Sequence, residues 1–559
     1  ILHTPLGGAM MKVLVWLGAA FFLLIAIALS LPFLIDLNKY QEQYRPAVEE
    51  ALNRKISLQD IQLTLWPRIG ARLAGFVVMD DPAFGERPFS SFTSVGVGVK
   101  LLPLLTGKVE VEEITLVDPV IAIIKNEQGV LNVSTLGRHG VAAPKTPSRA
   151  PIPSPEGPLK ILAMLAVDRI SITGGKLTYH DLSADKPTEY VLQDLEFLLQ
   201  PVRLGQSPGL HLATLVQPFN LPVALDGTFG PLKEAADIDA INLQLALGKT
   251  VFAIAGSTAG RHANFQVSAP VVNTADLPLA LPLKNAVEVK DLRIAAEVTG
   301  QDILLDNLSF QLFDGQVTAK GGMTSGTGAP PFNGRVVIEG VKLGPVMETI
   351  GTDALRVSGS AAGSLALQGR GFTKPDLTQA LDGTGKIAVK DGRIEGVNLM
   401  QEVSALFKVV GLSQDDVKAT AFTAIEADVG IKQGLVNVQR LLMDSHDFQA
   451  TGTGTVGFDR ALNLQVNLNL SEALSQKLSA GASAARLALS GGRLAVPMVI
   501  TGTLQAPSYG LDTKAVGAKV QEQVKEKVKE AAGELLTGSG RPEDMKQQGQ
   551  KLLKGLLGR

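Results

Sequence analysis

The sequence predicts a mainly β protein that begins with one transmembrane helix, continues as a long antiparallel sheet of short repeating strands, and ends in amphipathic helices. Three observations predict this fold class. An uncharged, mostly apolar run occupies residues 13–35. From about residue 56, apolar and polar residues alternate in many short segments, as in strands with one apolar and one polar face. After residue 512 the apolar residues recur at helical spacing.

The N-terminal apolar run is long enough to span a membrane. A helix of this length reaches roughly 34 Å, which exceeds the hydrocarbon core of a bilayer. Its residues include Val13, Trp16, Phe21, Phe22 and Ile35. The alternative is a cleaved signal peptide, since Ala26-Ile27-Ala28 has the form of a cleavage site. Because the apolar run continues well past this site, we expect a retained anchor, with residues 1–12 in the cytoplasm.

The composition excludes several classes of function. The chain has 559 residues, a net charge of −2 and no cysteine. The absence of a basic surplus argues against a nucleic-acid partner. The absence of cysteine excludes disulfides, thiolate nucleophiles and cysteine metal ligands. The length exceeds that of one ordinary domain.

Strand patterns supply the candidate functional residues. The clearest runs from Leu462 to Leu470, where apolar residues alternate with asparagine and glutamine. Each such strand has an apolar face that another layer or a ligand must cover. The candidate lining residues of an apolar groove are Ile61, Leu63, Leu65, Val97, Val99, Leu243, Leu245, Leu308, Phe310, Leu464, Val466 and Leu468.

The pattern changes along the chain define its regions. A short helix is expected after the anchor, with Asn38 and Gln41 as a capping box and Pro46 bending or breaking it. A second helical pattern covers Met400 to Val410. The expected regions are an N-terminal module of a short helix and strands at 36–136, a proline-rich loop at 137–159, a middle β region at 160–380, a C-terminal β region at 381–511, and an amphipathic helical tail at 512–559.

Glycine-rich and acidic motifs in this sequence predict turns and loops. Gly452 to Gly457 matches GxGxxG, but a strand pattern follows it, so we expect a glycine-rich turn. Asp314-Gly315, Asp382-Gly383 and Asp391-Gly392 are also expected turns. Asp80-Asp81-Pro82 and the residues around His446 are interpreted as solvated turns. We therefore predict no catalytic residue, metal site or cofactor, and a protein that is not an enzyme.

Alternation leaves open what covers the apolar faces. One arrangement is a set of β-sandwiches, and a second is one long sheet curled across its width with an open inner face. A transmembrane barrel is disfavoured because the chain has only two tryptophans and five tyrosines for aromatic girdles. The basic tail, with Leu552, Leu553, Leu556 and Leu557, either lies on a membrane surface or packs on its own domain.

Several stretches together resemble the AsmA family. They are Asp36–Tyr40, Leu65–Pro67, Asp81–Gly85, Pro88–Phe89, Leu101–Gly107, Asp118–Val120, Asn126–Gly129, Gly383–Leu399 and Val496–Tyr509. They cover about half of the chain in the family's order. The chain departs from the family pattern at Asn53-Arg54-Lys55, which lacks a glycine, and at Val133, where an aromatic residue is frequent.

The resemblance implies a lipid-handling envelope protein of the AsmA/TamB-like, bridge-like lipid-transfer superfamily. The expected fold is a curled sheet that forms a groove for phospholipid acyl chains. The expected location is the inner membrane of a Gram-negative bacterium, single-pass, with the bulk of the chain in the periplasm. The expected role is phospholipid transport and outer-membrane biogenesis, with the tail as a possible contact to the outer membrane or a partner there. The alternative role is a non-enzymatic scaffold or assembly factor for outer-membrane proteins.

Overall fold

The computed structural model describes residues 37–65, 68–106, 108, 110–137, 167–183, 188–233, 237–278, 283–326, 329–350, 356–407, 418–481, 489–490 and 493–515. The expected anchor, nearly all of the proline-rich loop and the tail beyond residue 515 lie outside these ranges. Among the residues so described, no helix combines the length and the apolar character needed to cross a membrane. The chain divides into two compact units, Ile1–Leu281 with Ala286–Leu308, and Pro282–Asn285 with Ser309–Arg559.

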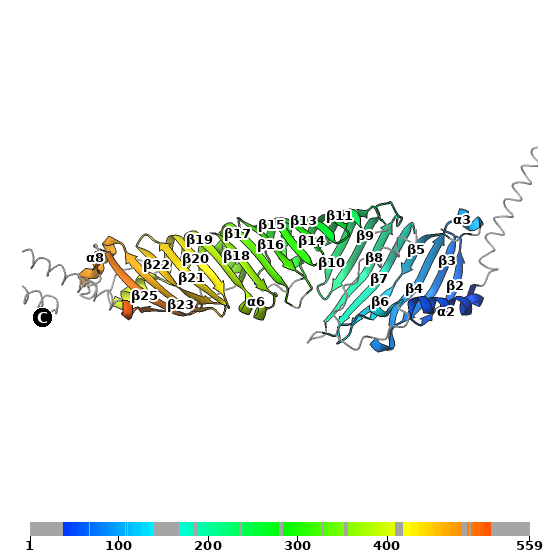
Figure 1. Ribbon diagram of the computed structural model, residues 1–559, viewed down its shortest axis with the longest axis horizontal. Coiled ribbons are helices and arrows are strands. Elements are labelled where there is room, and N and C mark those ends of the chain that lie inside the picture. The colour runs from blue at the N-terminus through cyan, green and yellow to red at the C-terminus, as the bar shows by residue number, and fades with distance from the viewer. Residues whose placement is uncertain are drawn as a thin grey trace, which may run out of the picture. The chain divides into compact units, whose positions relative to one another are not determined.

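The first unit consists mainly of strands, and most of its short helices lie near its beginning (Figure 1). Its strands are β1 (Ile56–Ser57), β2 (Asp60–Thr64), β3 (Gly70–Met79), β4 (Pro88–Val99), β5 (Val111–Val117), β6 (Val120–Lys125), β7 (Arg169–Asp181), β8 (Thr188–Gln200), β9 (Gly209–Gln217), β10 (Leu221–Gly230), β11 (Ile238–Leu247), β12 (Thr250–Ala259), β13 (His262–Asn273) and β14 (Glu288–Thr299). Its helices are η1 (Leu37–Tyr40), α2 (Gln41–Leu52), η2 (Pro82–Phe84), α3 (Leu101–Leu105), η3 (Asn132–Thr135) and η4 (Thr274–Asp276). Strand β15 (Asp302–Leu312) crosses the division between the units.

The second unit is also built mainly from strands. They are β16 (Gly315–Thr324), β17 (Pro331–Lys342), β18 (Arg356–Arg370), β19 (Asp382–Glu395), β20 (Ala419–Lys432), β21 (Leu435–Asp444), β22 (Phe448–Gly457), β23 (Ala461–Leu470), β24 (Leu489–Ser490), β25 (Arg493–Thr503) and β26 (Pro507–Leu511). Its helices are α5 (Leu343–Ile350), α6 (Lys374–Ala380), α7 (Leu399–Phe407) and α8 (Glu472–Gly481). The prediction of a mainly β protein is therefore confirmed, as is the predicted helix near Met400.

In the first unit, strands that are close in sequence pair with one another. Antiparallel pairs join β2 to β3, β3 to β4, and then each strand to the next from β7 to β14. Strands β5 and β6 occupy one position together, because both pair antiparallel with β4 and parallel with β7. The break between them falls at Asp118, whose φ is 45°, and the buried Pro119.

The parallel pairing corrects the expectation of a purely antiparallel sheet. A strand that runs parallel to its predecessor requires a crossover connection, because the chain must first return to the other edge of the sheet. The connection from β6 to β7 contains the proline-rich segment 137–159. The alternation of apolar and polar residues could not predict the parallel pairing. A strand with one apolar face shows the same alternation whether its neighbour runs parallel or antiparallel.

The second unit is antiparallel at every pairing within its described residues. The order runs from β16 through β23, then to β25 and β26, with β24 beside β25. Within each unit the described strands other than β24 thus belong to one hydrogen-bonded sheet, as in the single-sheet alternative and unlike the β-sandwich alternative. The curl of that sheet stays a prediction.

Several predicted turns lie inside strands. Gly452 to Gly457 belong to β22, and both Asp382-Gly383 and Asp391-Gly392 belong to β19. Those turn predictions are wrong because the glycines make room for neighbouring side chains. A Cβ atom at Gly392, for example, would lie 2.3 Å from Cζ of Phe422 on β20. The predicted turn at Asp314-Gly315 is confirmed, since Phe313 and Asp314 have φ of 47° and 64° between β15 and β16.

The first helix continues through Pro46, so the expected break is absent. A distant segment stabilises its last turn, because the backbone N–H of Gly137 donates to the carbonyl oxygen of Leu52. Asn38 bonds to Gln41, the residue with which the sequence pairs it, because its side-chain oxygen accepts from the Gln41 amide at 2.9 Å. Its side-chain oxygen accepts from the Ile61 N–H at 2.9 Å and its amide donates to Asp60 at 2.5 Å, so it ties η1 to the edge strand β2.

Candidate functional site

One face of the first sheet is apolar from strand to strand. Residues paired directly across neighbouring strands point to the same face. A first apolar row crosses from β2 to β12 through Ile61, Leu73, Val95, Leu116, Ile172, Phe197, Leu212, Leu225, Leu245 and Phe252. A second row on the same face reaches β14 through Leu63, Ala71, Val97, Ile114, Ile170, Leu199, Leu210, Gly227, Leu243, Ile254, Val267 and Ile294.

The opposite face of the same strands is largely polar. Its row lies between the two apolar rows in sequence, because successive side chains of a strand alternate between faces. It runs through Gln62, Arg72, Gly96, Thr115, Ser171, Leu198, His211, Asp226, Gln244, Ala253, Ser268 and Arg293. The first sheet therefore has two chemically distinct faces over its whole described width.

Only part of the first apolar face is closed over. A small cluster buries Leu199, Val202 and Leu232, with Phe197 and Leu210 packed against it. From β10 to β14 the apolar row is half-buried, as at Leu243 and Ile254. The described residues from β7 to β14 include no α-helix, and η4 is a single short turn. Aliphatic side chains of this stretch thus remain accessible in the described structure.

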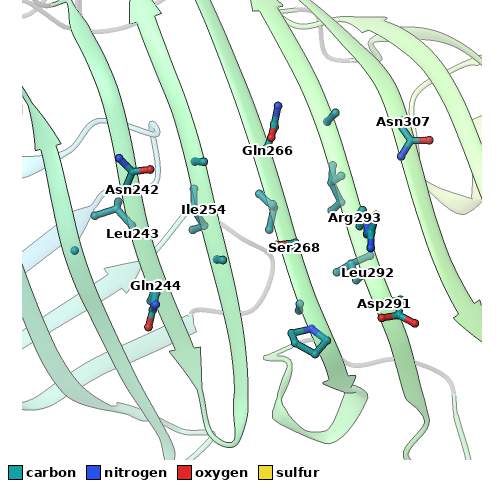
Figure 2. Close-up of a pocket in the computed structure, with 18 of the residues that line it drawn as sticks. Asn242, Leu243, Gln244, Ile254, Gln266, Ser268, Asp291, Leu292, Arg293 and Asn307 are labelled. Atoms are coloured by element: carbon teal, nitrogen blue, oxygen red, sulfur yellow. The ribbon is translucent and has the colours of Figure 1, made fainter.

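A hollow of about 930 Å³ lies against β10 to β15. Figure 2 shows its lining, with Leu243 and Gln244 on β11, Ile254 on β12 and Gln266 on β13. Its ionisable side chains are Asp226, Asp291 and Arg293. Its lining mixes residues of the polar row, such as Gln244, with residues of the apolar rows, such as Leu243.

The second sheet repeats the two-faced design. One apolar row runs through Val317, Ile338, Gly363, Ile387, Ala427, Leu441, Gly452, Val466, Met498 and Leu511. Beside it lies the row of Ala319, Val336, Leu365, Gly385, Val429, Val438, Gly454, Leu464, Ile500 and Tyr509. The other face carries Lys320, Arg335, Ala366, Thr384, Gly430, Asn437, Thr455, Asn463, Thr501 and Ser508.

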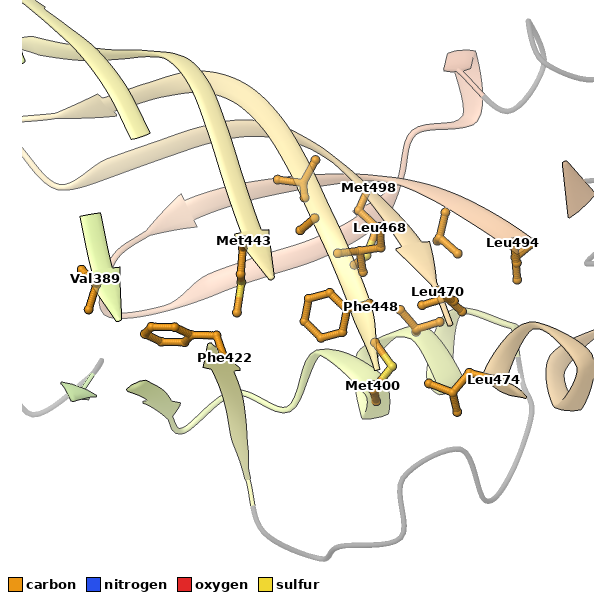
Figure 3. Packing of buried hydrophobic residues seen from close by; sticks show 14 residues of the cluster. Val389, Met400, Phe422, Met443, Phe448, Leu468, Leu470, Leu474, Leu494 and Met498 are labelled. Carbon is orange, nitrogen blue, oxygen red and sulfur yellow. The ribbon is translucent and has the colours of Figure 1, made fainter. Parts of the chain in front are cut away.

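The last strands of the second apolar face are covered by helices. Met400 and Val403 of α7 and Leu474 of α8 join one buried cluster with Leu468 and Met498 of the sheet. Figure 3 shows these side chains gathered between the strands and the two helices. By contrast, Ile387 of the same face is 40% exposed. The apolar face is therefore closed toward β25 and at Val389, and more open at Ile387 of the same strand β19.

The predicted lining residues are distributed between these environments. Ile61, Leu63, Val97, Leu243 and Leu245 lie in the apolar rows of the first sheet. Leu65 follows the end of β2, Val99 follows a register shift in β4, and Leu308 and Phe310 are half-buried in β15. Val466 and Leu468 are only 7% and 1% exposed, so they are packed core residues and not open lining. Leu464 packs against the same cluster, and the predicted anchor residues lie outside the described ranges.

Sequence reasoning missed a buried polar network at the end of β3. Asp80 is 8% exposed, and its carboxylate accepts from the amide of Asn132 at 2.7 Å. The Arg54 guanidinium lies 4.0 Å from Asp80 and donates to the Asn132 carbonyl oxygen at 3.0 Å. Asp81 caps η2, and the pKa of its carboxyl is lowered, first by the Ala83 N–H. Only Asp81 matches the predicted turn, since nothing in the local sequence indicated the partners of Asp80.

No arrangement typical of catalysis was identified in the described ranges. They hold no group of three or more histidine, cysteine, aspartate or glutamate side chains placed to bind a metal ion. His211 Nδ1 lies 2.5 Å from Asp226 on the polar face, where both side chains are about half exposed. The feature that continues from strand to strand in both units is the apolar face of the sheet.

A family model described as the AsmA family matches residues 8–280 and 283–441. The chain belongs to the AsmA family. No curated protein and no solved structure matches it significantly. The AsmA match includes every described strand from β1 to β20, and hence all of the open apolar face of the first unit. Helix α8 and the strands after β21 lie beyond the match.

Proposed function

We propose that this AsmA family protein binds phospholipid acyl chains along its apolar sheet faces and contributes to phospholipid transport and outer-membrane biogenesis. The observation that carries the proposal is the uninterrupted apolar row of the first unit, half-exposed from β10 to β14 and backed by a polar face. In this proposal residues 13–35 anchor the chain in the inner membrane and the rest lies in the periplasm.

The physical argument rests on the ligand that such a face accepts. Burial of a methylene group is favourable by about 0.8 kcal/mol, so an acyl chain laid along successive aliphatic rows gains free energy at every strand it crosses. The face offers no fixed charge for a headgroup in its two rows, whereas the opposite face is polar. A ligand with an apolar chain and a hydrated head matches this division, and no catalytic step is required.

Two adjacent residues give a matched test. Leu243 lies in the apolar row and Gln244 lies on the polar face of the same strand. The full chain is exposed to a phospholipid with a photoreactive group in its acyl chain, and adducts are measured by mass spectrometry. We expect Leu243→Glu to remove most adducts on β10 to β14 and Gln244→Glu to leave them. Equal adduct yields in the two folded variants would contradict acyl binding at this face.

The second candidate is a scaffold for outer-membrane protein assembly. The observation that favours it is the closed cluster under α7 and α8, because a dry core is what a purely structural body requires. It predicts cross-links to a protein and no bound phospholipid on either apolar face. The same adduct measurement therefore separates the two functions.

A further inference from the structure

Helix α3 exposes its leucines to an unusual degree. Leu101 is 50%, Leu102 is 78% and Leu104 is 37% exposed, although the helix has only five residues. Two lysines flank it, Lys100 at the N-cap, whose Nζ pairs with Glu110 at 3.1 Å, and Lys108 just beyond its end. Soluble surfaces rarely concentrate large aliphatic side chains in this way, and such clusters mark contact sites for a membrane or a protein.

The position of α3 favours a membrane. The helix follows β4, which pairs with β3, and β3 pairs with the edge strand β2. Asn38 of η1 bonds to the same edge strand, and η1 begins immediately after the apolar run of residues 13–35. Figure 1 shows α3 and α2 beside the first strands of this sheet, α3 at the upper ends of the strands and α2 at their lower ends. The exposed leucines and the point where the chain leaves the apolar run thus belong to one end of the first unit.

We propose that α3 inserts its leucines into the interfacial layer of the bilayer that holds the N-terminal anchor. The inference rests on the proposed membrane anchorage and deepens it. Apolar side chains flanked by lysine match the interface of a bilayer that contains anionic lipid. If both α3 and the N-terminal anchor contact the bilayer, the edge strand β2 lies between these contacts. Strand β2 and the beginning of the two apolar rows then face the bilayer. Acyl chains then reach the apolar face at Leu63, which is half-buried beside the buried Ile61.

The absence of natural cysteine permits a clean test. The full chain with Leu102→Cys carries a spin label and is reconstituted into vesicles of phosphatidylethanolamine and phosphatidylglycerol. Its collision rates with oxygen and with a water-soluble nickel complex are compared with those of Leu204→Cys. Leu204 is a matched control because it is 46% exposed in a loop of the same unit. We expect the Leu102 label to favour oxygen over nickel and the Leu204 label to favour nickel.

Two results would overturn the inference. One is nickel access at Leu102 equal to that at Leu204 in vesicles. The other is a disulfide between Leu102→Cys chains under mild oxidation, which would assign the patch to a second copy.

A further variant separates this inference from the proposed function. Leu102→Glu should reduce photoadducts on β10 to β14 at least about tenfold when lipid comes from the bilayer, a change that corresponds to 1.4 kcal/mol. The same variant should leave the adducts unchanged when lipid is supplied in detergent. Loss of adducts under both conditions would instead point to a damaged apolar face, and unchanged adducts from the bilayer would contradict a role of α3 in entry.

Discussion

Arg54 is buried at the meeting point of three segments. Its guanidinium donates to the backbone of Asn53 and Asn132 and to the hydroxyl of Thr135, and it lies 4.0 Å from the Asp80 carboxylate. Asn132 is fully buried and also bonds to the carbonyl oxygen of Ala122 on β6. These bonds join the end of α2, the end of β3 and the segment that leaves the sheet before the crossover.

Removal of the Arg54 charge should be strongly destabilising. In Arg54→Met the carboxylate of Asp80 keeps its burial and loses its cation, a change that typically costs 3–5 kcal/mol. The control is Arg45→Met, because Arg45 is 49% exposed and its ion pair with Glu49 should contribute less than about 1 kcal/mol. Urea unfolding measures both variants. Similar losses of unfolding free energy in Arg54→Met and Arg45→Met would show that the buried network around Arg54 does not stabilise these segments.

Tyr509 makes the second unit sensitive to alkaline pH. Burial, and then the charge of Glu402 in α7, raises the pKa of its hydroxyl from 10 to about 12. A group whose pKa is raised in the folded state contributes stability below its unfolded pKa and loses it as pH rises through the folded value. We therefore expect the thermal stability to fall between pH 10 and pH 12, and Tyr509→Phe to flatten this dependence. An unaltered pH profile in Tyr509→Phe would contradict the prediction.

At the scale of elements, period-two alternation was sufficient to predict strands and their faces. It was not sufficient to predict neighbours. The parallel pairing of β5 and β6 with β7 depends on a crossover, and the strand assignment of Gly452 to Gly457 depends on side chains of β23. Helix α7 is predicted by a local pattern and α8 is not, and the packing of both helices in the cluster of Leu468 is a long-range contact. Local sequence carries no information about which strand end a helix will cover.

Glycine inside a strand provides an element-scale prediction. At Gly385 of β19 a Cβ atom would lie 2.3 Å from Cδ2 of Leu365 and 2.7 Å from the Ser364 carbonyl oxygen on β18. We expect Gly385→Val to destabilise the second unit by about 1–3 kcal/mol because the pair must separate. Gly344→Ala in α5 is the control, since nothing lies within 4 Å of its Cβ position and alanine favours helix. Equal free energies of unfolding for the two variants, measured with denaturant, would show that Leu365 moves aside at no cost in stability.

At the scale of the molecule, each unit combines many short strands into two continuous faces. The sequence predicted the faces because each strand has its own alternation. It did not predict that registers align the apolar residues into rows, as in the pairs of Leu243 with Gly227 and Ile254. Register depends on bulges and turns, such as the shift between Ile238 and Ile241 on β11. The rows matter for function because a long apolar ligand requires contacts that continue across strands.

This continuity predicts a periodic pattern of lipid contact along a single strand. A photoreactive amino acid placed in turn at Ile241, Asn242, Leu243, Gln244 and Leu245 samples both faces of β11. If acyl chains lie on the apolar face, lipid adducts should form at the three odd-numbered positions and fail at the two even-numbered ones, because successive side chains point to opposite faces. The same probe at Leu468 should give few adducts, since α7 and α8 cover the cluster that contains it. Mass spectrometry of the full chain in its membrane measures the pattern. Uniform labelling along β11 would indicate nonspecific contact with lipid. Adducts only at Asn242 and Gln244 would place the ligand on the polar face, where the hollow of Figure 2 has its amide side chains.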